Sequence, residues 1–383
     1  MTVTSPQGFR AAGVRAGLKP SGAADLAVIV NDGPGYAAAG VFTSNRCKAN
    51  PVLWSEQALV NGVARAVVVN SGGANCYTGA AGFAITHRTA EAVGTALGIG
   101  AIDVQVGSTG LIGLLNDADT VLGGALAAVE ALSSDGGAAA ARAIMTTDSV
   151  PKQAVVRSGG FTVGGIAKGA GMLAPALATM LVYLTTDADV DAATLDQALR
   201  AATGTTFDRL DSDGCMSTND TVLLLGSAAS GVSPSRHEFF EAVRAVCHDL
   251  AMQLVRDAEG AEHEIAIEVR GAESESDAVE VARSVARSNL FKCAVYGRDP
   301  NWGRILASIG TTGAVFDPGD LDVALNGVWV CRASTPAEDP STVDLQAREV
   351  HVQIDLKSGV ASATVWTNDL THAYVHENSA YSS

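Results

Sequence analysis

The most informative stretch of this chain is the run KGAGMLAPALATML at residues 168–181. It places glycines, one lysine and a proline ahead of the small pair Ala178-Thr179. A threonine hydroxyl inside a chain has no base of its own. Cleavage before Thr179 would give this residue a free α-amine, whose pKa of about 8 suits a general base at neutral pH. We therefore predict cleavage between Ala178 and Thr179, with Thr179 as a nucleophile.

The residues before this bond suit a self-cleavage. Gly169, Gly171 and Pro175 can hold the backbone in the strained turn that an N-to-O acyl shift requires, and the alanines keep bulk away from the attacked carbonyl. A buried threonine that opens a strand is the plainer interpretation of Thr179. The motifs found elsewhere in the chain favour the nucleophile.

Composition limits the classes of protein to consider. A chain of 383 residues that is 47% apolar and 17% charged can bury a sizeable core, as two lobes or one large α/β unit. The net charge of −16 argues against nucleic acid or an anionic membrane as a partner. Residues 1–8 do not resemble a signal peptide, so we expect a cytoplasmic protein.

The six cysteines and seven histidines show no metal-binding spacing. His372 and His376 are four residues apart, but no helix is evident around them. We therefore expect no metal, and nothing in the sequence calls for an organic cofactor.

Strand-like and helix-like segments alternate, which predicts an α/β or α+β protein with layered sheets. Strands are expected where β-branched residues cluster or alternate with polar ones, and helices where alanine-rich or amphipathic runs occur. The expected strands span residues 26–30, 66–70, 104–107, 264–270, 350–356 and 362–368, and the expected helices span residues 82–97, 120–132, 191–203, 237–256 and 276–290.

Further motifs lie along nearly the whole chain. They are GVFTSNR at 40–46, STGLIG at 108–113, MTTD at 145–148, STNDT at 217–221, DAEG at 257–260, GRDPNWGR at 297–304 and the C-terminal residues Asp369-Leu370-Thr371, Tyr374-Val375, Asn378 and Tyr381. With the run at 168–181, these motifs resemble the ArgJ family, the ornithine acetyltransferase / glutamate N-acetyltransferase family of arginine biosynthesis.

The resemblance implies a fold of stacked β-sheets flanked by helices, the ornithine acetyltransferase/DmpA-like fold. It also implies an α chain of residues 1–178 and a β chain of residues 179–383, intertwined in one structural unit. Such αβ units are expected to form a homo-oligomer.

The resemblance assigns roles to residues that would otherwise seem ordinary. From the residues alone, Ser108-Thr109-Gly110 is a strand-ending turn. Lys168 is a solvated lysine by residue type, but as the one lysine in the otherwise uncharged run 158–186 it could also bind a substrate carboxylate. Glu259 is a carboxylate at a helix C-terminus, where a negative charge is slightly unfavourable and a contact with a substrate ammonium fits better. By resemblance, the Thr109 hydroxyl and the Gly110 N–H form an oxyanion hole. The expected substrate contacts are Thr146, Lys168, Thr179, Glu259, Asn378 and Ser383.

The implied activity is transfer of the acetyl group from N2-acetyl-ornithine to glutamate through an acetyl-threonine intermediate. The resemblance leaves open whether acetyl-CoA is a second donor. Two departures from the family pattern bear on acceptor preference: NSGGANCY at 70–77 in place of N-S-G-N-A-N-A-C, and DGCM at 213–216 in place of D-G-D-T.

Three other interpretations compete with acetyl transfer. Gly169 to Ala174 fits G-x-G-x-x-A, with Asp187 or Asp189 downstream, which is a weak signal for a dinucleotide-dependent oxidoreductase. Pro175 and the β-branched residues after it oppose the helix that this fingerprint needs. An N-terminal-nucleophile amidohydrolase or aminopeptidase would share Thr179 but use water. An inactive homologue is the third, and the joint presence of Thr109, Gly110 and Thr179 argues against it.

Overall fold

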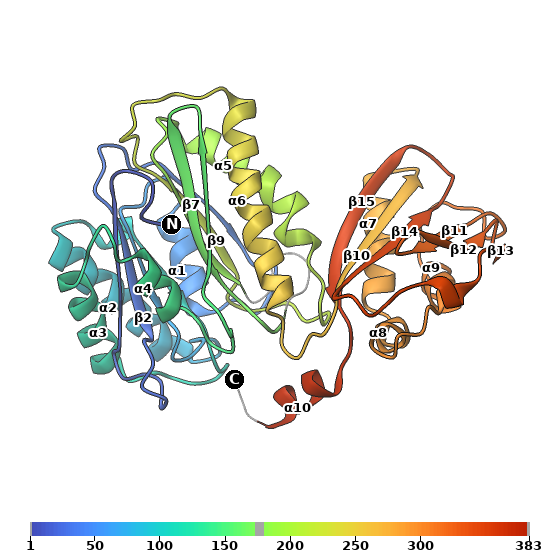
Figure 1. The fold of residues 1–383 in the computed structure, drawn as a ribbon. Helices are drawn as coiled ribbons and strands as arrows, with labels where there is room; N and C mark the ends of the chain where they lie inside the picture. The colour runs from blue at the N-terminus through green and yellow to red at the C-terminus, as the bar shows by residue number, and fades with distance from the viewer. Residues whose placement is uncertain (1, 173–179, 381–383) are drawn as a thin grey trace.

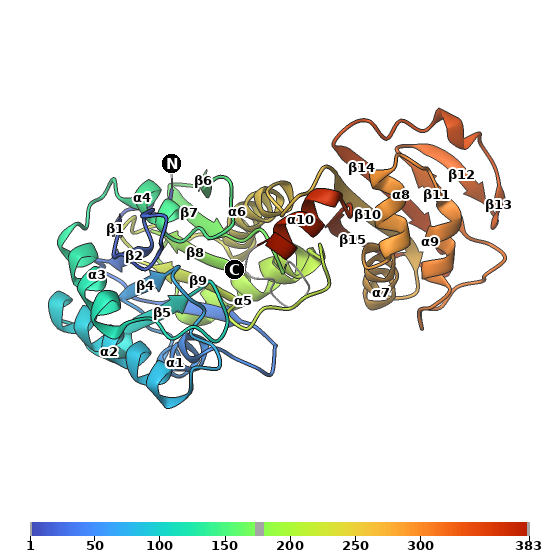
Figure 2. The same cartoon turned by 90° about the horizontal axis from the view of Figure 1, so that it is seen from below.

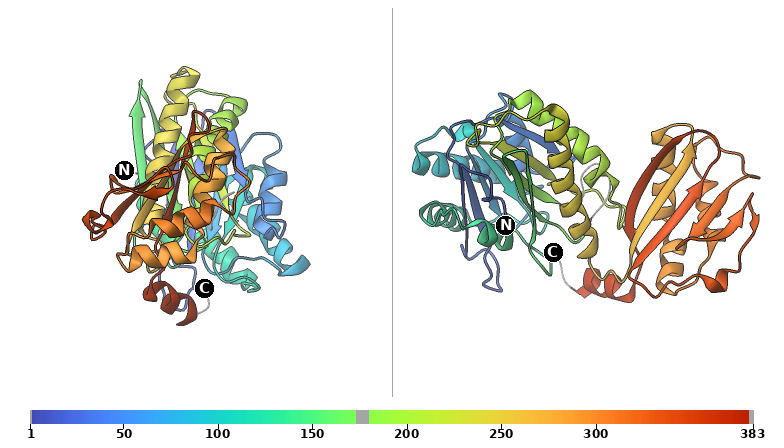
Figure 3. Two further views of the ribbon diagram at one scale, coloured as in Figure 1. Left: turned by 90° about the vertical axis from the view of Figure 1, so that its right-hand side faces the viewer. Right: turned by 45° about the horizontal axis from the view of Figure 1, so that its top comes forward.

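Two lobes make up the structure, a computed structural model that describes residues 2–172 and 180–380 (Figure 1). The N-terminal lobe contains a four-stranded and a five-stranded sheet, and the C-terminal lobe contains a six-stranded sheet. The right-hand view of Figure 3 shows the C-terminal lobe, in orange and red, beside the N-terminal lobe. Of the two arrangements that the chain length allowed, the protein adopts the two-lobed one.

The four-stranded sheet, in the order β1-β2-β4-β5, is buried on both faces. Successive side chains on a strand point to opposite faces, so on β2 Val28 packs toward the helices outside the sheet and Ile29 packs toward the second sheet. The strands are β1 (Phe9–Val14), β2 (Leu26–Asn31), β4 (Ala66–Asn70) and β5 (Val104–Ser108), and the helices of this half are α1 (Asn50–Ala58), α2 (Gly79–Leu97), α3 (Ala118–Glu130) and α4 (Gly137–Ala143).

The five-stranded sheet, in the order β3-β9-β8-β7-β6, stacks on the first sheet. Tyr183 packs toward the first sheet, and Val182 packs toward helices α5 and α6 on the opposite face. The layers are therefore helices, sheet, sheet and helices, which confirms the predicted fold class. The elements are β3 (Ala38–Phe42), β6 (Lys152–Ser158), β7 (Phe161–Lys168), β8 (Leu181–Thr186), β9 (Thr221–Gly226), α5 (Ala192–Thr205) and α6 (Arg236–Arg256).

The C-terminal lobe has a hydrophobic core of its own, between its sheet and helices α7 to α9. Its strand order is β13-β12-β11-β14-β10-β15. The elements are β10 (Glu264–Ala272), α7 (Glu275–Ala286), α8 (Asn289–Tyr296), α9 (Trp302–Ile309), β11 (Asp322–Leu325), β12 (Val328–Arg332), β13 (Thr335–Pro336), β14 (Glu349–Asp355) and β15 (Ala361–Asn368). Short 3₁₀ turns span Ala101–Asp103, Phe207–Arg209 and Pro340–Thr342.

Helix α10 (His372–Ala380) follows the last strand and returns to the junction between the lobes, as Figure 2 shows. The expectation that no helix surrounds His372 and His376 is therefore wrong. This helix has no buried face, but the Thr371 hydroxyl accepts a hydrogen bond from Tyr374 N at 2.9 Å and so caps its first turn.

The predicted strands are confirmed as β2, β4, β5, β10, β14 and β15, and four predicted helices are confirmed as α2, α3, α5 and α6. The helix expected over residues 276–290 is divided. It ends at Ala286, and the Ser288 hydroxyl caps a new helix, α8, by accepting a hydrogen bond from Phe291 N.

The proposed chain boundary between residues 178 and 179 does not coincide with the boundary between the lobes. Strand β7 before it and strand β8 after it are antiparallel neighbours in one sheet, with Lys168 opposite Leu181. The elements on the two sides of the proposed cleavage bond therefore share the five-stranded sheet.

Candidate active site

A cavity of about 290 Å³, here called the site cavity, gathers most of the predicted site residues. Its walls come from the end of β5, the end of β7, the loop after α4, the loop after α6 and helix α10. The predicted residues that line it are Thr109, Gly110, Thr146, Lys168, Glu259 and Asn378. The remaining predicted residues, Ala178, Thr179 and Ser383, lie outside the described residues.

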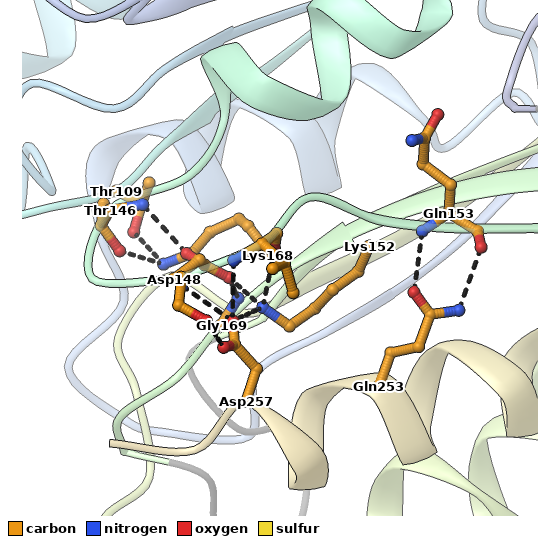
Figure 4. A network of polar contacts seen from close by, with 11 residues as sticks. Thr109, Thr146, Asp148, Lys152, Gln153, Lys168, Gly169, Gln253 and Asp257 are labelled. Carbon is orange, nitrogen blue, oxygen red and sulfur yellow. Dashed lines mark hydrogen bonds and ion pairs between the residues drawn. The ribbon is translucent and has the colours of Figure 1, made fainter. Parts of the chain in front are cut away.

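Lys168 is the centre of this arrangement. It ends β7 and is only 1% exposed, so it is not the solvated lysine that its residue type suggests. Its Nζ donates hydrogen bonds to Thr146 Oγ1 at 2.9 Å and to Thr109 Oγ1 at 3.1 Å, as Figure 4 shows. Because a hydroxyl has one donor and two acceptor positions, Thr109 keeps its own O–H available to donate to a ligand.

The turn at Thr109 and Gly110 is rigidly placed at the end of β5. Thr109 N donates to Asn70 O, and the Asn219 side-chain amide donates to Ser108 O at 2.8 Å. Gly110 has φ +123°, and a Cβ there would lie 3.0 Å from the N atom of Gly73. The site therefore requires glycine at position 110.

A buried charge network lies behind Lys168 (Figure 4). Asp148 accepts hydrogen bonds from Thr146 N at 2.9 Å and from Gly169 N at 2.7 Å, so one carboxylate fixes two segments of the site. Lys152 Nζ lies 2.6 Å from Asp148 Oδ1 and 2.6 Å from Asp257 Oδ2, and its side chain is fully buried. This network positions the residues that line the cavity.

The pKa values of these groups follow from burial and from their neighbours. Burial lowers the pKa of Lys168, against the opposing effect of Asp148. For Asp148, burial alone would raise the pKa, but Lys168, Lys152 and the Gly169 N–H outweigh it, and the pKa is lowered. Asp148 is therefore held as an anion, and it helps to retain the proton on Lys168.

Glu259 and helix α10 close another side of the cavity. The Asn378 amide donates to Glu259 Oε2 at 3.0 Å, and Glu259 N donates to Ala170 O at 2.9 Å. Gly260 allows the close approach of α10, since a Cβ there would lie 2.2 Å from Tyr374 N. The tail that follows the C-terminal lobe thus contributes to a cavity formed mainly by the N-terminal lobe.

Asp220 holds the chain where it re-enters the described part of the structure. Its Oδ1 accepts a hydrogen bond from Met180 N at 3.1 Å. Burial raises the pKa of this fully buried carboxyl well above its ordinary value. Since Met180 follows Thr179 in the sequence, Asp220 fixes the backbone immediately after the predicted nucleophile.

Several residues of this site were not predicted as such. Asp148 and Asp220 belong to the motifs MTTD and STNDT, and Tyr374 belongs to the C-terminal motif, but no site role was predicted for them; Lys152 carried no recognisable signal. The two departures from the family pattern are close to the site: Gly73 contacts Gly110, and Cys215 lines the cavity. A larger cavity of about 660 Å³, beside Arg209 and Arg283, contains none of the predicted residues.

The dinucleotide fingerprint is not supported by its surroundings. The strands on either side of it, β7 and β8, are antiparallel neighbours, whereas the fingerprint belongs to a βαβ unit with parallel strands. Within residues 2–172 and 180–380, no His, Cys, Asp and Glu side chains form a group of three that could bind a metal ion. In the same ranges, no helix combines the length and hydropathy needed to cross a membrane.

The chain is similar to known proteins over nearly its whole length. The family model described as "ArgJ family" matches residues 10–383. The chain is 63% identical over 383 residues to the arginine biosynthesis bifunctional protein ArgJ of Streptomyces avermitilis, with 100% of both chains covered. It is 54% identical to the protein of the same name from Mycobacterium leprae, with 100% of this chain and 96% of the relative covered.

Two solved structures are also similar in sequence. Ornithine acetyltransferase from Mycobacterium tuberculosis, solved with ornithine, is 56% identical, with 47% of this chain and 96% of that chain covered and a TM-score of 0.45. The ArgJ protein of Bacillus halodurans is 36% identical, with 51% of this chain and 97% of that chain covered and a TM-score of 0.49.

Proposed function

Because this chain belongs to the ArgJ family, we propose that it transfers the acetyl group of N2-acetyl-ornithine to glutamate in arginine biosynthesis, in the cytoplasm. The observation that carries the proposal is the convergence of Thr109, Gly110, Lys168 and Glu259 on one cavity, which Met172, shortly before the predicted cleavage bond, also lines. These groups suit an acyl transfer to or from an amino acid that has a carboxylate and an ammonium.

The proposed mechanism has two halves. The Thr179 Oγ attacks the acetyl carbonyl while its α-amine accepts the hydroxyl proton. The new Oγ–C bond forms, the C–N2 bond breaks, and ornithine leaves with that proton. The α-amine of glutamate then attacks the acetyl-threonine ester, the Oγ–C bond breaks, and N-acetylglutamate is released with Thr179 restored.

Each half passes through a tetrahedral oxyanion, which the Thr109 hydroxyl and the Gly110 N–H are proposed to stabilise. Lys168 supports this role, because its hydrogen bond to Thr109 Oγ1 polarises the hydroxyl. Asp148, paired with Lys152, fixes the backbone at Thr146 and so helps to position the hydroxyl that Lys168 contacts. Asp220 holds the backbone at Met180, beside the proposed nucleophile.

The proposal includes self-cleavage between Ala178 and Thr179, which would yield an α chain of residues 1–178 and a β chain of residues 179–383, and assembly of αβ units into a homo-oligomer. Because the relatives are named bifunctional, it also includes acetyl-CoA as a second acetyl donor. That activity is measured by release of the CoA thiol in the presence of glutamate.

The first experiment is the intact mass of the purified protein beside a Thr179→Ala variant, followed by an assay of N-acetylglutamate formation. We expect two fragments that divide at residues 178 and 179, absent from the variant, together with glutamate-dependent acetyl transfer. A single full-length mass in an active preparation would overturn the N-terminal threonine mechanism. Release of free acetate without N-acetylglutamate would instead favour a hydrolase.

A further inference from the structure

A second cavity, of about 180 Å³, adjoins the site cavity where the two lobes meet, and we call it the junction cavity. The two cavities share Asp213, Glu259 and Tyr374 as common walls. The rest of the junction cavity comes from both lobes, including Ser212 before β9, Asn289 and Lys292 on α8, and Asn368 at the end of β15.

Lys292 is the notable residue of this cavity, because a lysine is rarely buried without a partner of opposite charge. It is 5% exposed. Its Nζ donates to Ser212 O and lies 3.5 Å from Thr367 Oγ1. Among the described residues, no ion pair within 4.0 Å joins it to a carboxylate. An ammonium has three donors, so at least one is available to a ligand.

The acidic residues around Lys292 already have donors of their own. Asp213 accepts hydrogen bonds from two backbone N–H groups, and Asp369 accepts two more and pairs with His263. Asp211 pairs with an arginine. Burial lowers the pKa of Lys292, although these three carboxylates oppose the shift. A bound anion would offset the cost of burying this ammonium.

The two substrates of the proposed reaction differ in charge at the end of the side chain. Both carry an α-carboxylate, but N2-acetyl-ornithine ends in an ammonium and glutamate ends in a carboxylate. The site cavity offers Lys168 for the shared carboxylate and Glu259 for the ammonium. A second cation is needed for the glutamate side chain, and Lys292 lies in the adjoining cavity beyond Glu259.

We propose that the junction cavity is the subsite for the side-chain carboxylate of the acceptor, and that Lys292 selects glutamate over uncharged amino acids. This inference rests on the proposed function. It assigns the two oppositely charged side chains to neighbouring groups, Glu259 for the donor and Lys292 for the acceptor.

The test compares Lys292→Met and Lys292→Arg in two assays. The first is transfer to glutamate or glutamine. The second is exchange of labelled ornithine into N2-acetyl-ornithine without glutamate, which reports the donor half alone. For Lys292→Met we expect the KM for glutamate to rise about tenfold or more, because a buried hydrogen bond between charged groups is lost. The preference for glutamate over glutamine should disappear, while the exchange rate stays near that of the wild type.

Lys292→Arg should retain part of the preference for glutamate, since it keeps the charge. Lys357→Met, which removes a lysine from the surface of the C-terminal lobe, is the matched control and should change neither assay. A KM for glutamate that is unchanged in Lys292→Met, or an equal loss in both assays, would overturn the subsite.

A second variant avoids the structural bond of Lys292 to Ser212. Asn289→Asp adds a negative charge to the junction cavity at the first residue of α8, where an acidic residue favours the helix. It should raise the KM for glutamate and leave the exchange reaction unchanged, and an unchanged KM would count against the subsite. Absence of exchange in the wild-type protein would instead overturn the proposed function itself.

Discussion

Replacing the Thr109 hydroxyl tests the proposed oxyanion hole most directly. Thr109→Val keeps the shape of the side chain and removes its O–H, whereas Thr109→Ser keeps the O–H and removes a methyl group. Thr109 is 2% exposed, and its Oγ1 accepts a hydrogen bond from Lys168, so its O–H is the part free to meet an oxyanion. Loss of one such donor costs about 10²–10³ in kcat, or roughly 2.7–4 kcal/mol of transition-state stabilisation.

We therefore expect kcat for acetyl transfer to fall by about 10²–10³ in Thr109→Val and by about tenfold or less in Thr109→Ser. The assay is the steady-state rate of N-acetylglutamate formation, with intact mass used to confirm that all proteins are equally processed. Stability must be measured in parallel, because the valine also leaves the buried Lys168 with one acceptor fewer. A valine variant with nearly wild-type kcat, or a serine variant as impaired as the valine variant, would refute the assignment of the hydroxyl.

Three further predictions concern the charge network behind Lys168 and the turn at Gly110. Lys152→Met removes the cation that pairs with the buried Asp148 and the partly buried Asp257, and it should lower the free energy of unfolding by about 3–5 kcal/mol. Arg200→Met, which breaks an exposed ion pair, should leave the urea midpoint almost unchanged. Since the pKa of Asp148 is lowered in the folded protein, its stabilisation is present above its unfolded pKa and is lost as the pH falls through its folded pKa. Urea midpoints measured across this acidic range should fall more steeply for the wild type than for Asp148→Asn, and equal slopes would contradict the role of the carboxylate. Gly110→Ala should abolish acetyl transfer while the circular dichroism spectrum stays native-like. Position 110 has φ +123°, and a Cβ there would press on the backbone of Gly73. Full activity in this variant would contradict the need for glycine in the turn.

The local sequence pattern was sufficient to predict many of the strands and helices. The β-branched run of β2 and the amphipathic run of α6 each form the element that their periodicity predicts. Helix α10 could not be predicted in this way, because it buries no face and depends on the Thr371 cap and on contact with Gly260. Its existence is a property of the tertiary structure.

For the candidate site, too, local motifs could be recognised in the sequence, whereas contacts between distant residues could not. Motif resemblance identified Thr109, Lys168 and Glu259, which the fold brings to one cavity. The pairing of Lys152 with Asp257 joins residues 105 positions apart, and periodicity contains no information about such contacts. The uncharged run around Lys168 was the one local sign that this lysine is not an ordinary surface residue, whereas no such sign accompanies the buried Lys152 and Lys292.

The antiparallel pairing of β7 with β8 has a consequence for the protein after maturation. If the chain is cut between residues 178 and 179, the hydrogen bonds that join Val163–Lys168 to Leu181–Thr186 hold two separate polypeptides together. Unfolding would then release two molecules, and reassembly would become a bimolecular reaction whose yield depends on concentration. The mature protein would consequently be preserved by slow unfolding, because once dispersed its halves would have to find each other again.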